Sequence, residues 1–189
     1  MKSITKLLYL LLVAVFCNVN SFAGGDDKIG GIRAGYHSAN QFIDGDKIGG
    51  FDPLNSFYVG FYKTNRIVPI LNWEFGAEYF KNGAIRGNNK YELHYLSVPL
   101  DLKVKLGPVF VLGGLAPSFK VAEKWDLNGT KYDPTGDEKS EWFDAPVLVG
   151  VGFEILMFKI EARYHWGLME LSDDGTKNQY LQIGAGVSF

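Results

Sequence analysis

Ionisable side chains recur at even spacings in several apolar segments of this sequence. Glu74 and Glu78 alternate with aromatic residues and alanine, and Glu161, Arg163 and His165 alternate with Ile, Ala, Tyr and Trp. A period of two places such residues on one face of a β-strand, with the apolar side chains on the other. Because desolvated charges require partners, we expect this face to form a network of ion pairs. The predicted network consists of Arg33, Glu74, Glu78, Asp101, Lys103, Asp144, Glu154, Glu161, Arg163 and His165.

Histidine could supply general acid–base chemistry at three positions, His37, His94 and His165. We assign His165 to the charge network with Glu161 and Arg163. We expect His37 and His94 near the outer rim of the fold, where a histidine beside an acid could serve a hydrolase or an acyltransferase. The neighbouring groups in sequence are Ser38, Asp44, Asp46 and Glu92. We predict that these rim residues face water and that no residue is catalytic, and a rim enzyme stays open as an alternative.

The sequence lacks a clear binding motif for a cofactor or a metal. The glycines at Gly30-Gly31 and in the segment 150–152 are not followed by the helix that a phosphate-binding loop requires. The acidic segment 119–142 does not have the Asp-x-Asp-x-Asp-Gly spacing of a calcium loop. We therefore predict neither a cofactor nor a metal. Trp125 and Tyr132 in the same segment are our candidates for contact with an external partner.

The first 23 residues have the pattern of a secretory signal peptide. Lys2 and Lys6 precede an apolar run over residues 7–17, and the small residues that follow predict cleavage after Ala23. The remaining domain, residues 24–189, carries 17 basic and 21 acidic side chains, a net charge of −4, which argues against nucleic-acid binding. It contains no cysteine, so disulfides and thiolate chemistry are excluded for it.

Alternating segments fill residues 24–189, and none of the chain after the signal peptide shows a helical stripe. The eight segments are 29–38, 55–63, 71–79, 91–105, 109–118, 143–155, 159–168 and 180–189. Their connections are alternately short and long, as in an outer-membrane barrel with short periplasmic turns and long outer loops. The sequence therefore predicts an all-β fold, an eight-stranded antiparallel up-and-down transmembrane β-barrel. A change of parity between Tyr95 and Leu96 predicts a bulge, and Pro99 predicts a missing ladder bond.

The charged face also carries many glycines, which have no packing to offer on an outer surface. An eight-stranded barrel is narrow, so small residues beside long charged ones suit its interior. We therefore expect the charged face in the lumen and the apolar face toward lipid, where barrel closure removes unpaired strand edges. The candidates for the aromatic girdles at the membrane interfaces are Trp73, Tyr79, Tyr91, Trp142, Trp166 and Phe189.

Four segments resemble, in order, motifs of one protein family. Residues 95–103 are similar to its Y-L-x-I-P-L-x-L-K segment, residues 143–154 to its glycine-rich sixth strand, residues 163–168 to its R-Y-x-x-G-L segment and residues 182–189 to its terminal strand. The family is that of small outer-membrane barrels of Gram-negative bacteria that includes PorT-type proteins, related in architecture to OmpX and the OmpA barrel. The resemblance implies the fold, an outer-membrane location and a terminal Phe189 that acts as a recognition signal for the barrel-assembly machinery. Pro146 departs from the glycine that is usual in the sixth strand.

These features favour a non-enzymatic, monomeric outer-membrane barrel without an open pore. The partners that we expect are outer-membrane lipid, the barrel-assembly machinery and an extracellular or envelope protein reached through the outer loops, in envelope assembly, secretion or adhesion. A fold of this kind does not by itself specify one activity. The alternatives are a soluble periplasmic lipocalin-like ligand-binding barrel and an outer-membrane rim hydrolase or acyltransferase. A secretion-accessory role like that of PorT is implied by the resemblance alone.

Overall fold

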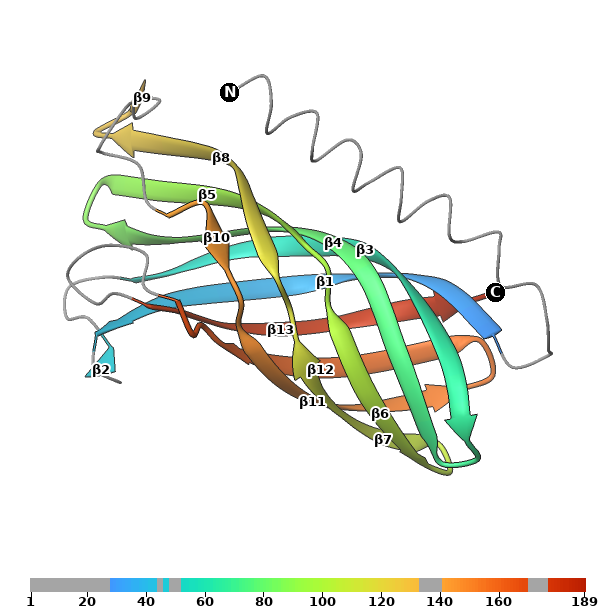
Figure 1. The fold of residues 1–189 in the computed structure, drawn as a ribbon. Coiled ribbons are helices and arrows are strands. Elements are labelled where there is room, and N and C mark those ends of the chain that lie inside the picture. The colour runs from blue at the N-terminus through green and yellow to red at the C-terminus, as the bar shows by residue number, and fades with distance from the viewer. Residues whose placement is uncertain (1–27, 44–45, 48–51, 133–140, 170–176) are drawn as a thin grey trace, which may run out of the picture.

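Antiparallel strands form a closed barrel in the computed structural model (Figure 1). The structure describes residues 28–43, 46–47, 52–132, 141–169 and 177–189, and the predicted signal peptide lies outside these ranges. The strands are β1 (Lys28–Ile43), β2 (Asp46–Lys47), β3 (Asp52–Val68), β4 (Leu71–Arg86), β5 (Asn89–Ser97), β6 (Leu100–Leu106), β7 (Val109–Leu115), β8 (Ser118–Leu127), β9 (Thr130–Tyr132), β10 (Phe143–Asp144), β11 (Val147–Ile155), β12 (Phe158–Trp166) and β13 (Lys177–Ser188).

Eight continuous paths of chain make the barrel wall, because β5 with β6, β7 with β8, and β10 with β11 each run through it as one interrupted strand. The wall closes where β1 pairs with β13, with Ile32 opposite Val187. The predicted eight-stranded up-and-down barrel is thereby confirmed. Closure leaves no free edge within the wall, which is the condition for strands in hydrocarbon.

A proline stands at each of the three interruptions of the wall strands. Pro99 separates β5 from β6, Pro117 separates β7 from β8, and Pro146 separates β10 from β11. Proline donates no backbone hydrogen bond, so the ladder breaks there, but its carbonyl still accepts one. The amides of Gly76, Val98 and Ala116 donate to Pro99, Pro117 and Pro146 at 3.1, 2.8 and 2.9 Å. The three prolines thus form a row across adjacent strands without opening the wall.

The prediction that the side chains change face at a bulge between Tyr95 and Leu96 is wrong. Leu93 and Tyr95 are buried, as are Ser97 and Asp101 further along, so the inward parity continues through this path. The irregularity lies instead in the partner strand, where Tyr95 pairs with Lys120 and His94 pairs with Ala122. The additional residue is therefore on β8.

The two ends of the barrel differ in their connections. Two-residue turns join β3 to β4, β6 to β7 and β11 to β12 at one end, where the two ends of the wall also meet: the amide of Phe189 donates to the carbonyl of Gly30 at 2.8 Å. We call it the short-turn end. At the other end, residues 81–90 lie within the long connection predicted between the segments 71–79 and 91–105. They form a hairpin in which β4 and β5 continue to a tight turn at Gly87, whose φ of 57° suits glycine.

Candidate functional site

Two arginines and three glutamates occupy the centre of the lumen. Arg33 lies within 2.5 Å of Glu74 and of Glu78, and 3.5 Å from Glu161. Arg163 lies 2.8 Å from Glu78 and 3.5 Å from Glu161. All five residues are at most 2% exposed. Because each arginine contacts at least two of the carboxylates, these buried charges compensate one another, as burial requires.

Lysines extend this network toward the short-turn end. The Nζ of Lys159 is 3.2 Å from both Glu74 and Glu161, and it lies 3.5 Å from the centre of the Tyr62 ring. The Nζ of Lys103 is 2.7 Å from Glu154. Lys159 was not included in the predicted network. The sequence contained the signal, because Lys159 stands two positions before Glu161 and therefore shares its face.

Three predicted members of the network are buried in the lumen but form no ion pair with the described residues. Asp101 is 3% exposed, and neither of its carboxylate oxygens has a hydrogen-bond partner in the part of the chain that the structure describes. Asp144 is 1% exposed. His165 packs its ring on Tyr180 with a centroid distance of 4.2 Å, so its described contacts are aromatic stacking rather than ion pairing.

An aromatic layer fills the lumen on the side of the charged centre that is remote from the short turns. His37 stacks on Phe80 at 4.9 Å and packs against Tyr180 at 4.8 Å, and Phe80 stacks on Tyr95 at 5.8 Å. All of these side chains are at most 2% exposed. The layer lies between the charged centre and the outer end of the barrel, and it leaves the lumen filled by packed rings.

The two histidines of the rim-enzyme alternative are not brought together. His37 is fully buried, and its Nε2 lies 2.8 Å from Asn82 Oδ1 inside the lumen, so its prediction as a water-facing rim residue is wrong. His94 lies on the outward face, where its Nδ1 is 2.6 Å from the hydroxyl of Tyr79. Asp44 lies outside the described residues. His37 and His94 therefore face opposite sides of the wall and do not form a shared acid–base pair.

Lumen-facing glycines make room for large side chains of neighbouring strands. A Cβ at Gly184 would lie 2.3 Å from the Tyr58 hydroxyl, and one at Gly152 would lie 2.2 Å from the Phe110 ring. Such distances are far inside van der Waals contact. The alternation of glycine with charged and aromatic residues is thus the means by which a narrow lumen is filled.

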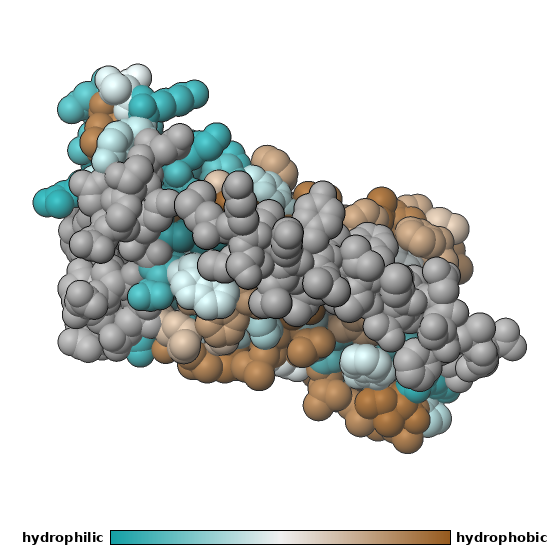
Figure 2. Space-filling view, turned by 45° about the horizontal axis from the view of Figure 1, so that its top comes forward, coloured by the Kyte–Doolittle hydropathy of each residue, from teal (hydrophilic) through white to brown (hydrophobic). Residues whose placement is uncertain are grey.

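The outer wall is apolar. Phe61, Ile160, Val151 and Leu102 are each more than half exposed there. A soluble lipocalin-like barrel would need the opposite arrangement, with its apolar face inside, so that alternative is wrong. Figure 2 shows the hydrophobic side chains over much of the wall and the hydrophilic ones gathered where the β8–β9 hairpin projects.

Aromatic residues gather toward both ends of the wall. Trp73 stacks on Phe75 at 4.9 Å, and Trp142 stacks on Phe119 at 5.9 Å. Trp166 packs on Tyr164 at 4.6 Å. The remaining predicted girdle residues are Tyr79 on the wall, Phe189 at the end of β13 and Tyr91. Tyr91 differs from the prediction, because it packs against Trp125 on the sheet face that continues the lumen.

A sheet extends beyond the wall at the end opposite to the short turns (Figure 1). It continues residues 80–86 of β4, 89–94 of β5 and 121–127 of β8 past the wall, from the level at which Phe80 and Asn82 still face the lumen, and it includes all of β9; we call it the projecting sheet. One of its faces carries Tyr91, Trp125 and Tyr132. Trp125 contacts Tyr91 edge-on at 5.5 Å and Tyr132 at 5.9 Å, and Tyr132 is 38% exposed. The two predicted partner-contact residues therefore belong to one aromatic cluster.

The opposite face of the projecting sheet is rich in lysine. The strand register places Lys90, Lys124 and Lys131 on this face together with Lys81, Glu92, His94 and Asp126. Lys90 lies 2.8 Å from Glu92 and Lys81 lies 3.9 Å from it. Burial raises the pKa of Glu92, but the hydrogen bond from Lys90 and the charge of Lys81 outweigh it, so the pKa lies below its ordinary value. Lysines outnumber carboxylates on this face.

The described residues contain no group of three His, Cys, Asp or Glu side chains arranged to hold a metal ion. Within the same residues, no helix is long and apolar enough to cross a membrane.

Comparisons with solved structures identify the fold. Ail, the attachment invasion locus protein of Yersinia pestis, in complex with the heparin analogue sucrose octasulfate, is similar over 86% of this chain and 99% of its own, with a TM-score of 0.57 and 18% sequence identity. Neisserial surface protein A is similar over 85% of this chain and 97% of its own, with a TM-score of 0.58 and 16% identity. At these identities the likeness concerns the fold.

Two comparisons of the sequence itself add to this result, one with curated proteins and one with models of protein families. No curated protein matches this sequence. Residues 32–173, most of the chain, match the model of the family described as outer membrane protein beta-barrel domain. With its apolar wall and charged lumen, the chain belongs to this family of outer-membrane β-barrel proteins and is a protein of the outer membrane.

Proposed function

We propose that this protein is a non-enzymatic outer-membrane barrel without an open pore, and that it acts by binding an external partner through the projecting sheet. The observation that carries the proposal is the contrast between two parts of the barrel. The lumen is filled by buried charges and rings, whereas the sheet that extends past the wall carries an aromatic cluster with half-buried Tyr91 and Trp125 and exposed Tyr132.

The filled lumen supports the absence of an open pore. Arg33 and Arg163 are at most 1% exposed at its centre, and His37, Phe80 and Tyr180 are packed together beyond them. An ion would have to displace these paired charges and stacked rings. The separation of His37 and His94 onto opposite faces of the wall supports a non-enzymatic role, because general acid–base chemistry needs its groups within reach of one substrate.

The aromatic cluster supports partner binding. Tryptophan and tyrosine are enriched at the energetic centres of protein interfaces, because they bury large areas at a low cost in side-chain entropy. Trp125 is held in place by its neighbours, and its Nε1 donates a hydrogen bond to Glu123 at 3.0 Å. A pre-organised ring of this kind needs little ordering on binding.

The lysine face favours a second candidate, a polyanionic polysaccharide as the partner. Lys90, Lys124 and Lys131 share this face, and the solved structure of Ail contains the sulfated heparin analogue sucrose octasulfate. Clustered lysines attract sulfate groups by charge, and such binding weakens as salt rises.

Adhesion of whole cells tests both candidates. Bacteria producing the protein would be added to surfaces coated with extracellular-matrix protein or with heparin. If the aromatic cluster is the contact, the double variant Trp125→Ala/Tyr132→Ala loses adhesion while Tyr164→Ala, on the wall, keeps it. If the lysine face is the contact, Lys124→Gln/Lys131→Gln loses adhesion to heparin alone. Unchanged adhesion by both double variants, each shown to be folded by heat-modifiable gel migration, would refute the proposal.

A third possible partner is a protein within the cell envelope, which an accessory of assembly or secretion would bind. A photoreactive residue at position 125 distinguishes the two kinds of partner in living cells. A partner within the envelope gives a cross-linked adduct when no coated surface is present, whereas an extracellular partner does not.

We further propose that residues 1–23 are removed as a signal peptide and that Phe189 is read by the barrel-assembly machinery. Phe189 follows β13 and is 80% exposed, so its ring is accessible to a receptor. Mass spectrometry of the protein from outer membranes should give an N-terminus at Gly24. Phe189→Ala should reduce the amount of assembled barrel, with the protein retained unfolded in the periplasm.

A further inference from the structure

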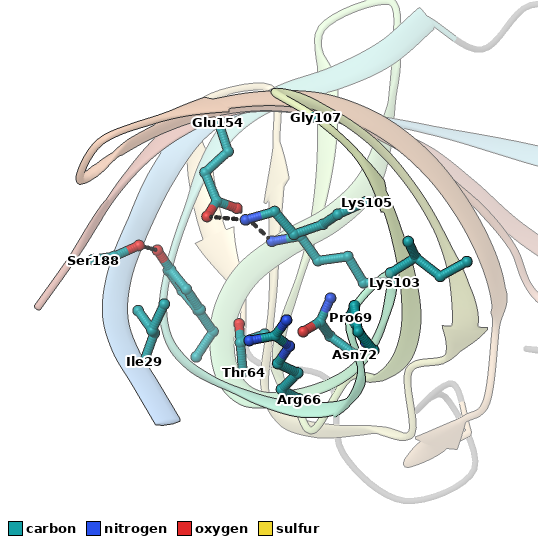
Figure 3. A pocket seen from close by; sticks show the side chains of 12 residues that line it. Ile29, Thr64, Arg66, Pro69, Asn72, Lys103, Lys105, Gly107, Glu154 and Ser188 are labelled. Atoms are coloured by element: carbon teal, nitrogen blue, oxygen red, sulfur yellow. Dashed lines mark hydrogen bonds and ion pairs between the residues drawn. The ribbon is translucent and has the colours of Figure 1, made fainter. Parts of the chain in front are cut away.

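A polar cavity of about 430 Å³ opens at the short-turn end of the lumen. Figure 3 shows Arg66, Lys103, Lys105 and Glu154 among the residues around this opening. Lys103 and Lys105 both lie within hydrogen-bond distance of Glu154, at 2.7 and 2.8 Å. Among the described residues, three cationic side chains and one carboxylate line the cavity, and this excess of cationic groups suits an anion.

A hydrogen-bond donor that lacks a partner belongs to the same cavity. Asn72 is 7% exposed and lines the cavity, and its Nδ2 has no hydrogen-bond partner among the described residues. Its polar neighbours already have hydrogen-bond partners. Thr64 donates to Glu74 at 2.9 Å, and the hydroxyls of Tyr62 and Ser188 lie 2.7 Å apart. A buried donor without a partner is costly, so this amide is a position at which an acceptor would be stabilised.

The rim of the cavity is apolar. Ile29 and Ile70 line the cavity beside Pro69, and they are 42% and 55% exposed. The neighbouring short turn between β11 and β12 is also apolar, with Leu156 91% exposed at its tip. The apolar side chains at the rim and the cationic groups inside it together make the opening amphipathic.

We propose that this cavity binds the phosphate of an amphiphile, a phospholipid of the inner leaflet, with the phosphate inside the mouth and an acyl chain along Ile29, Pro69 and Ile70. Arg66, Lys105 and Asn72 supply donors from β3, β6 and β4, and charge-assisted bonds from such groups are the strong ones in phosphate recognition. A volume of about 430 Å³ is in the range of small-ligand pockets, roughly 300–1,000 Å³. Lys103 and Thr64, which line the cavity, also contact Glu74 of the charged centre.

Titration of the folded protein in nonionic detergent tests the proposal by NMR. Monododecyl phosphate is the amphiphilic probe and inorganic phosphate is the probe for the head alone. We expect monododecyl phosphate to shift the amide signals of Arg66, Asn72 and Lys105 with saturation. The double variant Arg66→Gln/Lys105→Gln should bind about tenfold more weakly, because two charged donors are lost. The matched variant Lys90→Gln/Lys131→Gln, which removes two positive charges from the projecting sheet, should bind as the native protein does.

The outcomes separate the sources of the phosphate. Saturable shifts with monododecyl phosphate and none with inorganic phosphate support the lipid. Equal affinity for both probes overturns the lipid and assigns the site to free phosphate. Unchanged amide signals at Asn72 and Lys105, or equal binding by native protein and the Arg66→Gln/Lys105→Gln variant, overturns the site. Heat-modifiable migration confirms that each variant is folded, and Asn72→Asp, which replaces the donor by a carboxylate of the same shape, gives an independent loss of binding.

Discussion

Arg163 on β12 and Glu78 on β4 form an ion pair of 2.8 Å across the lumen, although their strands are not neighbours in the wall. Glu78 also contacts Arg33 on β1, so one carboxylate connects three strands through the interior. Ladder hydrogen bonds connect only adjacent strands. The lumen charges therefore add the contacts that fix the cross-section of the barrel.

Replacing Arg163 by methionine should destabilise the folded barrel by about 3 kcal/mol, because it leaves Glu78 and Glu161 as buried charges with a lost partner. The free energy of unfolding would be measured by urea titration in lipid vesicles. Lys105→Met is the control, since Lys105 is 31% exposed and its ion pair with Glu154 should contribute less than about 1 kcal/mol. Equal losses for the two variants would contradict this ranking.

Alternation is strict where charges stand opposite aliphatic residues, as around Glu161, and there the sequence indicates which side chains are buried. It fails where the lumen is aromatic. Leu93 and Tyr95 are apolar and yet face inward, next to Phe80 and Tyr180, so polarity does not mark the lipid side there and a bulge was expected in error. The burial of His37 was missed because its ring partners Phe80 and Tyr180 are far from it in the sequence, although the fold brings them together.

The projecting sheet was missed for a different reason. Beyond the membrane a strand needs no apolar face, so the polar segment 81–90 has the composition of a loop although it forms a hairpin. Pairing with β8 stabilises this hairpin, and that contact is not visible in the local sequence. By contrast, the sequence was sufficient to predict the missing ladder bond at Pro99, because proline lacks a backbone N–H donor in any strand.

Two adjacent glycines on β7 should differ in their tolerance of alanine. A Cβ at Gly114 would lie 2.0 Å from the carbonyl oxygen of Leu100 and 2.7 Å from the carboxylate of Asp101, whereas one at Gly113 would lie 3.5 Å from its nearest neighbour. A backbone oxygen cannot rotate away, so Gly114→Ala should cost about 2 kcal/mol or more and Gly113→Ala close to none. The temperature of the heat-modifiable gel shift gives the comparison, and equal shifts would refute the packing argument.

Arginine on the lipid-facing wall should be costly in proportion to its depth. Val151 is 51% exposed in the middle of β11, whereas Leu156 is at the tip of the short turn that follows. Val151→Arg should therefore destabilise the barrel in vesicles by about 2–4 kcal/mol and Leu156→Arg by about 1 kcal/mol or less. Urea titration provides the measurement. A larger loss at Leu156 than at Val151 would mean that the turn, and not the middle of the strand, lies deepest in hydrocarbon.

Cysteine labelling should reveal the orientation of the barrel. The sequence contains one cysteine, Cys17, within the predicted signal peptide, so a single introduced cysteine reports without background. Lys131 is exposed on the projecting sheet and Leu156 is 91% exposed at the short-turn end. A membrane-impermeant maleimide added to intact cells should label Lys131→Cys and spare Leu156→Cys, because short turns of such barrels face the periplasm. Both positions should react once the outer membrane is permeabilised, which shows that each thiol is accessible. The reverse pattern would place the projecting sheet in the periplasm and exclude an extracellular partner for Trp125.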